Sequence, residues 1–511
     1  MEDKRIIKNL IITYVMMFFI LPLGYFIRIL YAKNLPIELY GLLYAILGIV
    51  PLVSMFNDLG FSETLNYFIP RFLVKKNWTK ARTAGAYALF IQTITAFLIS
   101  LIVFFNAAYI ADKFFHSPSA VLFIKIFILM FFFYNIAYTL KAFMNGLKEI
   151  SFVNGMELLR LSLIYIFSLV LIFIIKPIQI STYLAIIWVG AYSLSLIIFG
   201  CIFIRRYPQI AILKINPNKV LFKKMFHYAI YVMFGTGALF ILTKIDIVVV
   251  TFMLGVQDVA YYTTALSIMS IIPMFLIPIS GLILPLVSEL NFKKDNKKIK
   301  KIIETFYNII LPLVLPFILI FIAYPSLIIK ILFTKEFLPS ALGIVIFSIA
   351  SIFNIIYTFN FSLLAAFGLV KQRTKLLYIA AALNLVLDIF LVIYFGYIGV
   401  VIATSLIWVF LSISTFLLIK KRIYFKVYFF KLLKTLLAGF IFLAFVSVLK
   451  QLISLNPYIE SGLIIILSLI LYFILIIIFK AINLKKTLNF VKIIIPAFVW
   501  VRYFKKLDKY L

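Results

Sequence analysis

Long runs of apolar residues recur along the whole chain, separated by short polar or basic stretches. Each run is about 20 residues long, which is enough for an α-helix to cross the hydrocarbon core of a bilayer. The runs do not alternate between apolar and polar residues, as the strands of a membrane β-barrel do. The pattern therefore predicts an all-α polytopic membrane protein. The fourteen predicted spans are Asn9–Leu30, Glu38–Phe56, Ala84–Phe105, Val121–Leu140, Phe152–Ile175, Tyr183–Ile204, Tyr228–Leu254, Ala260–Leu286, Ile309–Ile329, Ala341–Phe367, Leu376–Phe395, Val400–Leu418, Thr435–Leu449 and Ser461–Phe479.

The basic residues alternate between the two sides of this predicted topology. Of the 49 Lys and Arg residues, 39 fall at the termini and in the even-numbered connections, 6 fall in the odd-numbered connections, and four lie inside spans. Positive charge concentrates on the cytoplasmic side of membrane proteins. We therefore predict a multi-pass protein of the cell membrane with both termini in the cytoplasm. The same asymmetry explains the net charge of +32 without a nucleic-acid partner.

The basic connections divide the chain into five predicted segments. These are a six-helix lobe (1–204), a cytoplasmic linker (205–224), a second six-helix lobe (225–420), spans thirteen and fourteen (421–480), and an interfacial amphipathic tail on the cytoplasmic face (481–511). The tail mixes large apolar residues with Lys and Arg, the composition of a helix that lies on a membrane surface. The loop at 291–301 holds six lysines, for which anionic lipid headgroups are the expected partner.

Composition argues against several other classes of protein. The chain is 65% hydrophobic and only 13% charged, whereas soluble domains carry about 25% charged residues. The single cysteine, Cys201, cannot form an intrachain disulfide, and we expect it in the core. The two histidines, His116 and His227, fall on opposite sides of the membrane, and the metal spacing of Cys and His is absent. A phosphate-binding Gly-Lys-Ser/Thr loop is absent too. We predict no metal, no cofactor and no enzymatic activity.

Charged residues inside spans are the candidates for chemistry, because a charge in the membrane is costly and usually faces a bundle interior or a wet cavity. The seven are Arg28, Lys125, Glu157, Arg160, Lys244, Asp246 and Asp388. Lys125 lies near the outer end of its span and is expected to reach the headgroups. The remaining cations, Arg28, Arg160 and Lys244, are the candidates for binding an anionic substrate. The acids Asp246, Asp388 and Glu157 are candidates for ion coupling or for the cavity.

Each of these residues also has a structural interpretation. Glu157 and Arg160 are one helical turn apart and could neutralise each other. Lys244 and Asp246 point to different helix faces, so each needs another partner, and Arg28 is a candidate partner of Asp246. Asp388 could serve in a structural hydrogen bond. Arg28, near an outer end, could also extend to the headgroups.

Two further groups of residues are candidates for function. One lies at the cytoplasmic end of span two and just beyond it, and the other consists of aromatic residues within the spans. Asp58 and Arg71 are candidate gate or loop-anchoring residues. Aromatic side chains can stack on sugars. With 18% aromatic residues, most are expected to face lipid or the core. The candidates for stacking are Tyr134, Tyr138, Tyr261 and Tyr262.

Several short motifs occur in a characteristic order. Tyr40-Gly41-Leu42 is followed by Asp58-Leu59-Gly60-Phe61, and in the second half Asn384 leads to Gly396-Tyr397-Ile398-Gly399. Together with the span count, they resemble the polysaccharide-export branch of the multidrug/oligosaccharidyl-lipid/polysaccharide (MOP) flippase superfamily, over residues 5–420. The resemblance implies a MATE-like fold, with two six-helix lobes in a V and two additional C-terminal helices.

The resemblance also implies a function. A flippase of this branch exports a polyprenyl-(pyro)phosphate-linked oligosaccharide by alternating access through a cavity between the lobes. The main alternative is a cation-coupled multidrug antiporter of the MATE branch, although the first span here lacks the acidic residue that such antiporters often carry. A membrane glycosyltransferase or polysaccharide polymerase is a further alternative. Those classes typically need acidic or large outer loops, and the predicted outer loops are short.

Overall fold

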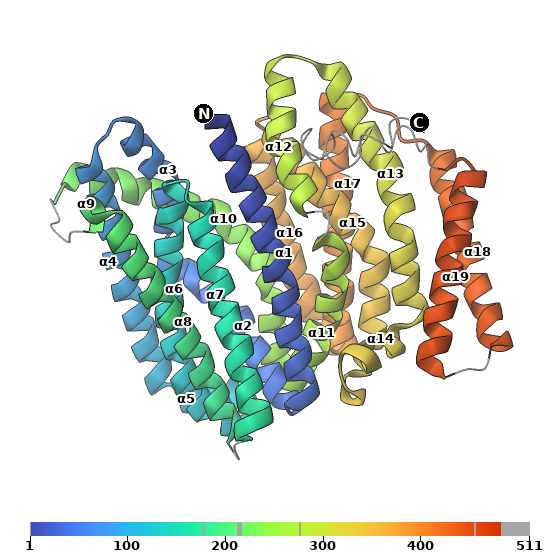
Figure 1. The fold of residues 1–511 in the computed structure, drawn as a ribbon, viewed down its shortest axis with the longest axis horizontal. Coiled ribbons are helices and arrows are strands. Elements are labelled where there is room, and N and C mark those ends of the chain that lie inside the picture. The colour runs from blue at the N-terminus through green and yellow to red at the C-terminus, as the bar shows by residue number, and fades with distance from the viewer. Residues whose placement is uncertain (1, 177–178, 212–216, 275–276, 454–455, 482–511) are drawn as a thin grey trace. The chain divides into compact units, whose positions relative to one another are not determined.

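The computed structural model describes residues 2–176, 179–211, 217–274, 277–453 and 456–481, and all the regular structure within these ranges is helical (Figure 1). Among the described residues, 12 helices are long and apolar enough to cross a membrane, or 13 when the bent helix α10 counts as one span. The chain forms two compact units. Unit 1 comprises residues 1–260 with 332–334, and unit 2 comprises residues 261–331 with 335–511.

Unit 1 is a bundle in which α6 packs against α3, α4 and α8, while α7 packs against α1 and α8. Two short turns, a 3-10 turn before α6 (Pro118–Ala120) and a π turn after α7 (Leu171–Ile175), complete it. The helices are α1 (Glu2–Asn34), α2 (Ile37–Asp58), α3 (Phe61–Val74), α4 (Trp78–Phe105), α5 (Ala107–Lys113), α6 (Val121–Gly146), α7 (Ile150–Val170), α8 (Ile180–Arg206), α9 (Pro208–Ala211) and α10 (Lys219–Met253).

A sharp break separates α2 from α3. Leu59 and Gly60 both adopt the left-handed conformation, with φ values of 47° and 81°. The Ser62 N–H donates to Asp58 Oδ1 at 3.0 Å and the Ser62 hydroxyl donates to the same oxygen at 2.6 Å, which caps the first turn of α3. A Cβ at Gly60 would lie 2.1 Å from the Ala229 carbonyl oxygen of α10. Glycine is therefore required here both by φ and by the close approach of α10.

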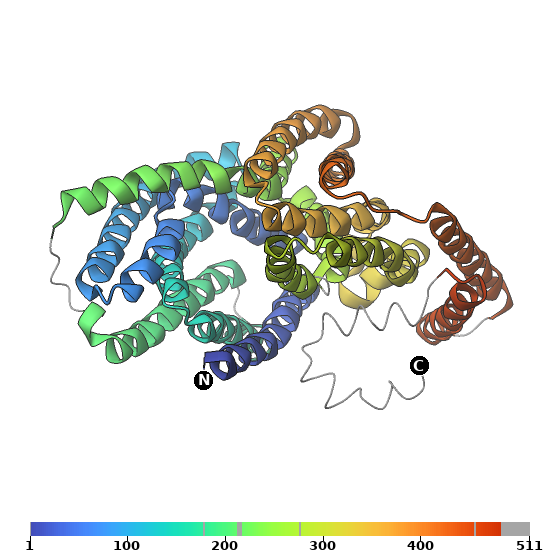
Figure 2. The same cartoon turned by 90° about the horizontal axis from the view of Figure 1, so that it is seen from above.

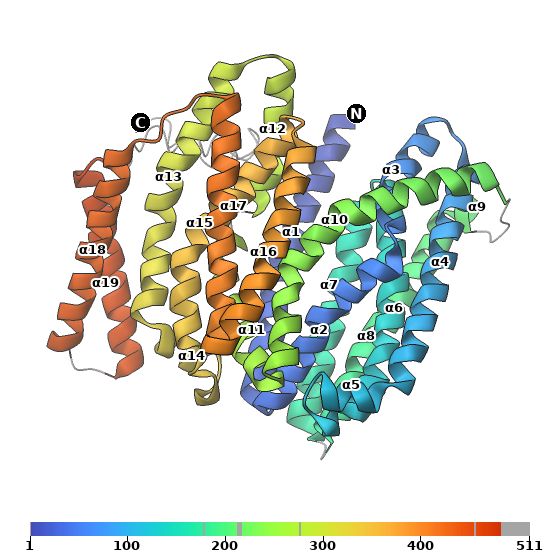
Figure 3. The ribbon, with the colours of Figure 1, turned by 180° about the vertical axis from the view of Figure 1, so that it is seen from behind.

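Helix α10 crosses α3 and α4 obliquely with its first half and then runs beside α2 (Figures 2 and 3). The two parts, Lys219–Gly235 and Gly237–Met253, differ in direction by 45°. Its first half completes an apolar core with α3, α4 and α6. The buried residues of this core are Phe61, Leu65, Ile69, Ala81, Ala84, Ala88, Ala142, Phe143, Leu221, Met225 and Ala229. Alanines on α4 allow the helices to approach closely.

Unit 2 is built around α15 and α17, which pack against each other, with α12 and α13 on α15 and α16 on α17. Helix α11 begins in unit 1 and continues into unit 2. In Figures 1 and 3, α18 and α19 lie side by side, and both contact α13; the Tyr472 hydroxyl donates to the Pro312 carbonyl at 2.9 Å. The elements are α11 (Val256–Met274), α12 (Ile277–Phe292), α13 (Asn296–Ala323), α14 (Pro325–Leu332), the 3-10 turn Lys335–Phe337, α15 (Ser340–Ala366), α16 (Val370–Phe395), α17 (Tyr397–Arg422), α18 (Phe429–Leu452) and α19 (Pro457–Ile478).

The helical class of the fold is confirmed, but the count of fourteen spans is not. The eighth predicted span, 260–286, includes residues 275–276, which lie outside the described ranges, between α11 and α12. The boundary between the two compact units falls at residues 260/261 of the chain. The two six-helix lobes predicted from the sequence, 1–204 and 225–420, remain a prediction. The predicted interfacial tail, apart from Ala481, lies outside the described residues. Cys201, expected in the core, is exposed on α8.

Candidate functional site

Arg28 is held in unit 1 by the residue one turn further along α1. The Tyr31 side chain is fully buried, and its hydroxyl lies 2.7 Å from Ser168 Oγ on α7. The indole N–H of Trp188 on α8 donates to the same hydroxyl at 3.2 Å. These contacts fasten the end of α1 to α7 and α8, because a buried hydroxyl needs its partners satisfied. They fix the position from which Arg28 extends.

The Arg28 guanidinium contacts two tyrosines of α2. Its Nη1 donates to the Tyr40 hydroxyl at 3.3 Å, and its Cζ lies 3.9 Å from the centroid of the Tyr44 ring. A guanidinium over an aromatic face is stabilised by the ring's negative face, the more so when water is excluded. Arg28 is therefore positioned by aromatic residues within the bundle, and its side chain does not depend on headgroups for its partners.

Lys244 and Asp246 on α10 belong to the same region of unit 1. Lys244 is half-buried, Asp246 is buried, and Lys244 lies within electrostatic range of both Arg28 and Asp246. The three groups, two cations and one anion, carry one net positive charge. We call Arg28, Lys244 and Asp246 the first charge cluster.

A second charge cluster joins α6 and α7. The Glu157 carboxylate accepts from Lys141 Nζ and from both Nε and Nη2 of Arg160, with Nε at 3.4 Å. Glu157 and Arg160 thus form the pair that their spacing allowed, while a role in binding or ion coupling stays a prediction. The structure adds Lys141 as a second cation, so the second charge cluster also carries one net positive charge.

Aromatic residues surround the second charge cluster. The Arg160 Cζ lies 4.6 Å from the centroid of the Tyr192 ring on α8, and Tyr134 meets Tyr192 edge-on at 5.8 Å. Tyr134 and Tyr138 lie one turn apart on α6 with their rings nearly parallel. Arg160 is buried, whereas the side chains of Glu157 and Lys141 remain 29% and 21% exposed. An approaching ligand therefore meets Lys141 and Glu157 before Arg160.

Lys141 was not among the predicted intramembrane charges, because the predicted fourth span ended at Leu140. The helix continues to Gly146, so Lys141 lies inside the apolar helix and not in a loop. One signal was available: Tyr134, Tyr138 and Lys141 follow the i, i+4, i+7 spacing that places residues on one helix face. A basic residue that continues an aromatic face of a helix is thus a candidate for substrate binding, even where the predicted span ends.

Asp58 and Arg71, the candidate gate residues, both have local structural roles. Asp58 caps α3, as described above. The Arg71 guanidinium lies 3.5 Å from the Tyr67 ring centroid, and Tyr67 stacks on Tyr228 of α10 at 4.3 Å. These contacts tie α3 to α10 and fit the loop-anchoring alternative for Arg71, while the gate role stays a prediction.

Asp388 and Lys125, the remaining predicted intramembrane charges, belong to neither charge cluster. Asp388 is fully buried on α16 of unit 2, where the Asn384 amide donates to it at 2.6 Å. Lys125 on α6 lies 5.1 Å from the centroid of the Phe104 ring, and Phe104 is exposed. An exposed aromatic partner is consistent with a peripheral position for Lys125.

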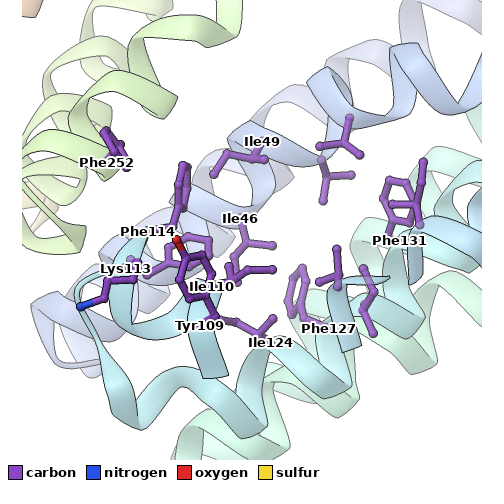
Figure 4. A pocket seen from close by; sticks show the side chains of 16 residues that line it. Ile46, Ile49, Tyr109, Ile110, Lys113, Phe114, Ile124, Phe127, Phe131 and Phe252 are labelled. Carbon is purple, nitrogen blue, oxygen red and sulfur yellow. The ribbon is translucent and has the colours of Figure 1, made fainter. Parts of the chain in front are cut away.

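Unit 1 contains an apolar cavity with a volume of about 400 Å³ (Figure 4). Ile46 and Ile49 on α2 face Phe127 and Phe131 on α6 across it, and Lys113 and Tyr109 supply its few polar atoms. A phosphate or a sugar hydroxyl would find almost no partner on this lining, and an unpaired polar group is costly there. This cavity is therefore suited to an apolar group and not to a charged one.

Comparisons with known proteins identify the family of the chain. A family model described as polysaccharide biosynthesis protein matches residues 6–291. The uncharacterized membrane protein MJ1068 of Methanocaldococcus jannaschii is 27% identical over 404 residues, which cover 76% of this chain and 80% of that protein.

Two solved structures share the fold. The lipid II flippase MurJ, in an inward closed conformation, has a TM-score of 0.68 and 18% identity, covering 92% of this chain and 99% of its own. An inward-facing multidrug resistance MATE family transporter of the MOP superfamily has a TM-score of 0.66 and 12% identity, covering 81% and 97%. At these identities the likeness concerns the fold alone, which is that of MOP superfamily transporters, as the motifs predicted.

Proposed function

We propose, from the premise that this chain belongs to the polysaccharide biosynthesis protein family, that it moves a polyprenyl-(pyro)phosphate-linked oligosaccharide across the cytoplasmic membrane by alternating access. The observation that carries the proposal is the pair of charge clusters in unit 1, each with two cations to one anion. A phosphate carries negative charge through the membrane only where cations replace its water, because desolvating an unpaired charge costs several kcal/mol.

The carboxylate within each cluster has a part in this mechanism. An empty site with unpaired cations inside a membrane would be costly, and Glu157 balances Lys141 and Arg160 while no phosphate is bound. A phosphate that enters shares the cations with Glu157, so binding is favourable without being tight. A transporter needs this balance, since the substrate must leave on the other side.

Multidrug antiport is the second candidate, because the MATE fold is shared. The charge clusters favour the glycan substrate: a site for cationic drugs would be expected to carry net negative charge. The acids Asp246, Asp388 and Glu157 stay candidates for ion coupling under either proposal. A glycosyltransferase or polymerase activity gains no support from the family match.

Reconstitution would test the proposed function. Purified protein in liposomes should move a fluorescent polyprenyl-pyrophosphate-linked oligosaccharide from the inner to the outer leaflet, measured as accessibility to an added glycosidase. Empty liposomes give the background, and ethidium efflux from the same vesicles tests drug transport. Efflux of ethidium without movement of the glycan lipid would overturn the proposal in favour of the antiporter.

The proposal includes a topology with fourteen spans and both termini in the cytoplasm. With Cys201→Ser as background, Asn296→Cys should react with an impermeant maleimide only after the membrane is permeabilised. Asp112→Cys, at the exposed end of α5, should react in intact cells. Both positions are exposed, so accessibility depends on the side of the membrane. Labelling of both in intact cells would contradict the topology.

The basic segment 291–301, which includes the first turns of α13, is the proposed contact with anionic lipids. Asp295 caps α13 by accepting from the Lys298 N–H at 3.1 Å, and the hydrogen bonds from Lys298 hold the pKa of this carboxyl below its usual value. The neighbouring lysines Lys293, Lys297 and Lys298 are exposed. An exposed cluster of this kind attracts a negatively charged leaflet at about 1 kcal/mol per basic residue.

A further inference from the structure

Unit 1 contains a small cavity of about 190 Å³ whose lining includes five side chains with oxygen atoms. It lies among α2, α3, α6 and α10, apart from the apolar cavity of Figure 4. Two carboxylates line it, Asp58 and Glu63, together with three hydroxyl groups, those of Ser54, Tyr134 and Tyr138. We call these five residues the acidic cavity.

Neither carboxylate of the acidic cavity has a cationic partner among the described residues. Asp58 accepts from Ser62 and from the Gly60 backbone, and Glu63 accepts from the Asn66 amide at 3.2 Å. The two acids lie within electrostatic range of each other and of the Tyr138 hydroxyl. Two like charges at the end of a membrane span repel each other, and among the described residues neutral hydrogen-bond donors stabilise them but no cation does.

The cations on the surrounding helices are engaged elsewhere. Lys141 on α6 pairs with Glu157, and Arg71 on α3 lies over Tyr67. On α10, Lys244 interacts with Asp246, and Lys223 and Lys224 are exposed near the start of the helix. The negative charge of the acidic cavity is therefore left for something that binds there.

Ser54 gives an independent indication of a ligand. Its side chain is only 5% exposed, it lines the acidic cavity, and its Oγ has no hydrogen-bond partner among the described residues. A serine inside a helix usually bonds to a carbonyl one turn earlier, and buried hydroxyls are nearly always paired. An unpaired buried oxygen beside two unbalanced carboxylates indicates a binding site.

We infer that the acidic cavity binds a small inorganic cation, with Na⁺ as the probe ion. All of its donors are oxygen atoms, the ligands that hard cations prefer, and water can complete the coordination. The described residues of the lining include no His or Cys side chain, the ligands that zinc prefers. This inference goes beyond the proposed function and does not depend on the identity of the transported substrate.

Equilibrium binding of sodium to the full-length protein in detergent tests the inference. Thermal unfolding is followed as choline chloride is replaced by NaCl at constant ionic strength, and bound radioactive sodium is counted per chain. A ligand that binds only the folded state raises the midpoint of unfolding. We expect Glu63→Gln and Ser54→Ala to raise the half-saturating Na⁺ concentration about tenfold or more, which corresponds to about 1.4 kcal/mol.

Neither variant changes Asp58 or Ser62, whose hydrogen bonds cap α3. Loss of the sodium response can therefore be distinguished from loss of folding. Asp112→Asn removes one carboxylate from an exposed helix far along the chain and should leave the sodium response unchanged. Unchanged sodium binding by Glu63→Gln and Ser54→Ala would overturn the inference. So would a wild-type protein whose stability depends on pH but not on Na⁺ or K⁺, because that result would assign the site to a proton. Neither result concerns glycan movement, so failure here is distinct from failure of the proposed function.

Discussion

Replacing Arg28, Arg160 and Lys244 together by alanine should abolish glycan export at equal protein abundance. The triple variant removes the cations that would replace water around the phosphates, leaving Lys141 alone among the four cations of the charge clusters. A hydrogen bond to a charged group is worth about 1.5–3 kcal/mol, so each single alanine variant should lower export by about tenfold or more. Surface display of glycan, normalised to the amount of protein in the membrane, is the measurement.

Charge-conserving and peripheral variants serve as controls for this prediction. Arg160→Lys and Lys244→Arg should retain part of the export, because they keep the charge while changing the geometry of donation. Lys125→Ala removes an intramembrane cation beside exposed Phe104 and should export normally. Full export by the triple variant would return Arg28, Arg160 and Lys244 to a purely structural role.

Lys141→Ala probes the part of the second charge cluster that only the structure revealed. Its loss leaves Glu157 paired with Arg160 alone, so the second charge cluster changes from one net positive charge to neutral. We expect export to fall as far as it does in Arg160→Ala. Restoring net charge with Glu157→Gln in the same chain should recover part of the loss, because Arg160 is then available to the phosphate.

The apolar runs were sufficient to predict the helical class and most of the spans, since a bilayer demands about 20 apolar residues from each crossing helix. They did not predict how helices end or bend. The break at Leu59-Gly60 depends on two left-handed residues and on Asp58 capping α3, and α10 bends by 45° between Gly235 and Gly237. Hydropathy does not register any of these local features.

The charge clusters were only partly predictable, for a related reason. A spacing of three identified the pair Glu157 and Arg160, because both lie on one helix. Lys141 reaches Glu157 from a different helix, so its role depends on packing between α6 and α7. The acidic cavity is a similar case: Ser54, Glu63 and Tyr138 come together only after α2, α3 and α6 are folded.

Some of the short sequence motifs carry no reactive side chain but mark places where helices pack closely. Gly41 belongs to the motif Tyr40-Gly41-Leu42, and a Cβ at this position would lie 1.8 Å from the Val256 carbonyl oxygen. Val256 opens α11 directly after Gly255, whose φ is 102°. The motif thus marks the place where the first turns of α2 touch the backbone that leads into α11, and no side chain fits between them.

Gly41→Ala should therefore prevent unit 1 from folding normally, with a loss of about 1–3 kcal/mol or more from overpacking. The obstacle is a backbone carbonyl, so no neighbouring side chain can move aside to relieve the clash.

Two other glycines serve as controls. Gly48→Ala on the same helix meets only the Ile247 side chain, at 2.5 Å, and should be rescued by Ile247→Ala. Gly190→Ala on α8 meets no atom within 4 Å and should be neutral or slightly stabilising, because alanine favours a helix over glycine. Monodisperse yield and the midpoint of thermal unfolding are the measurements. A Gly41→Ala protein as stable as Gly190→Ala would show that α2 and the start of α11 do not make this contact.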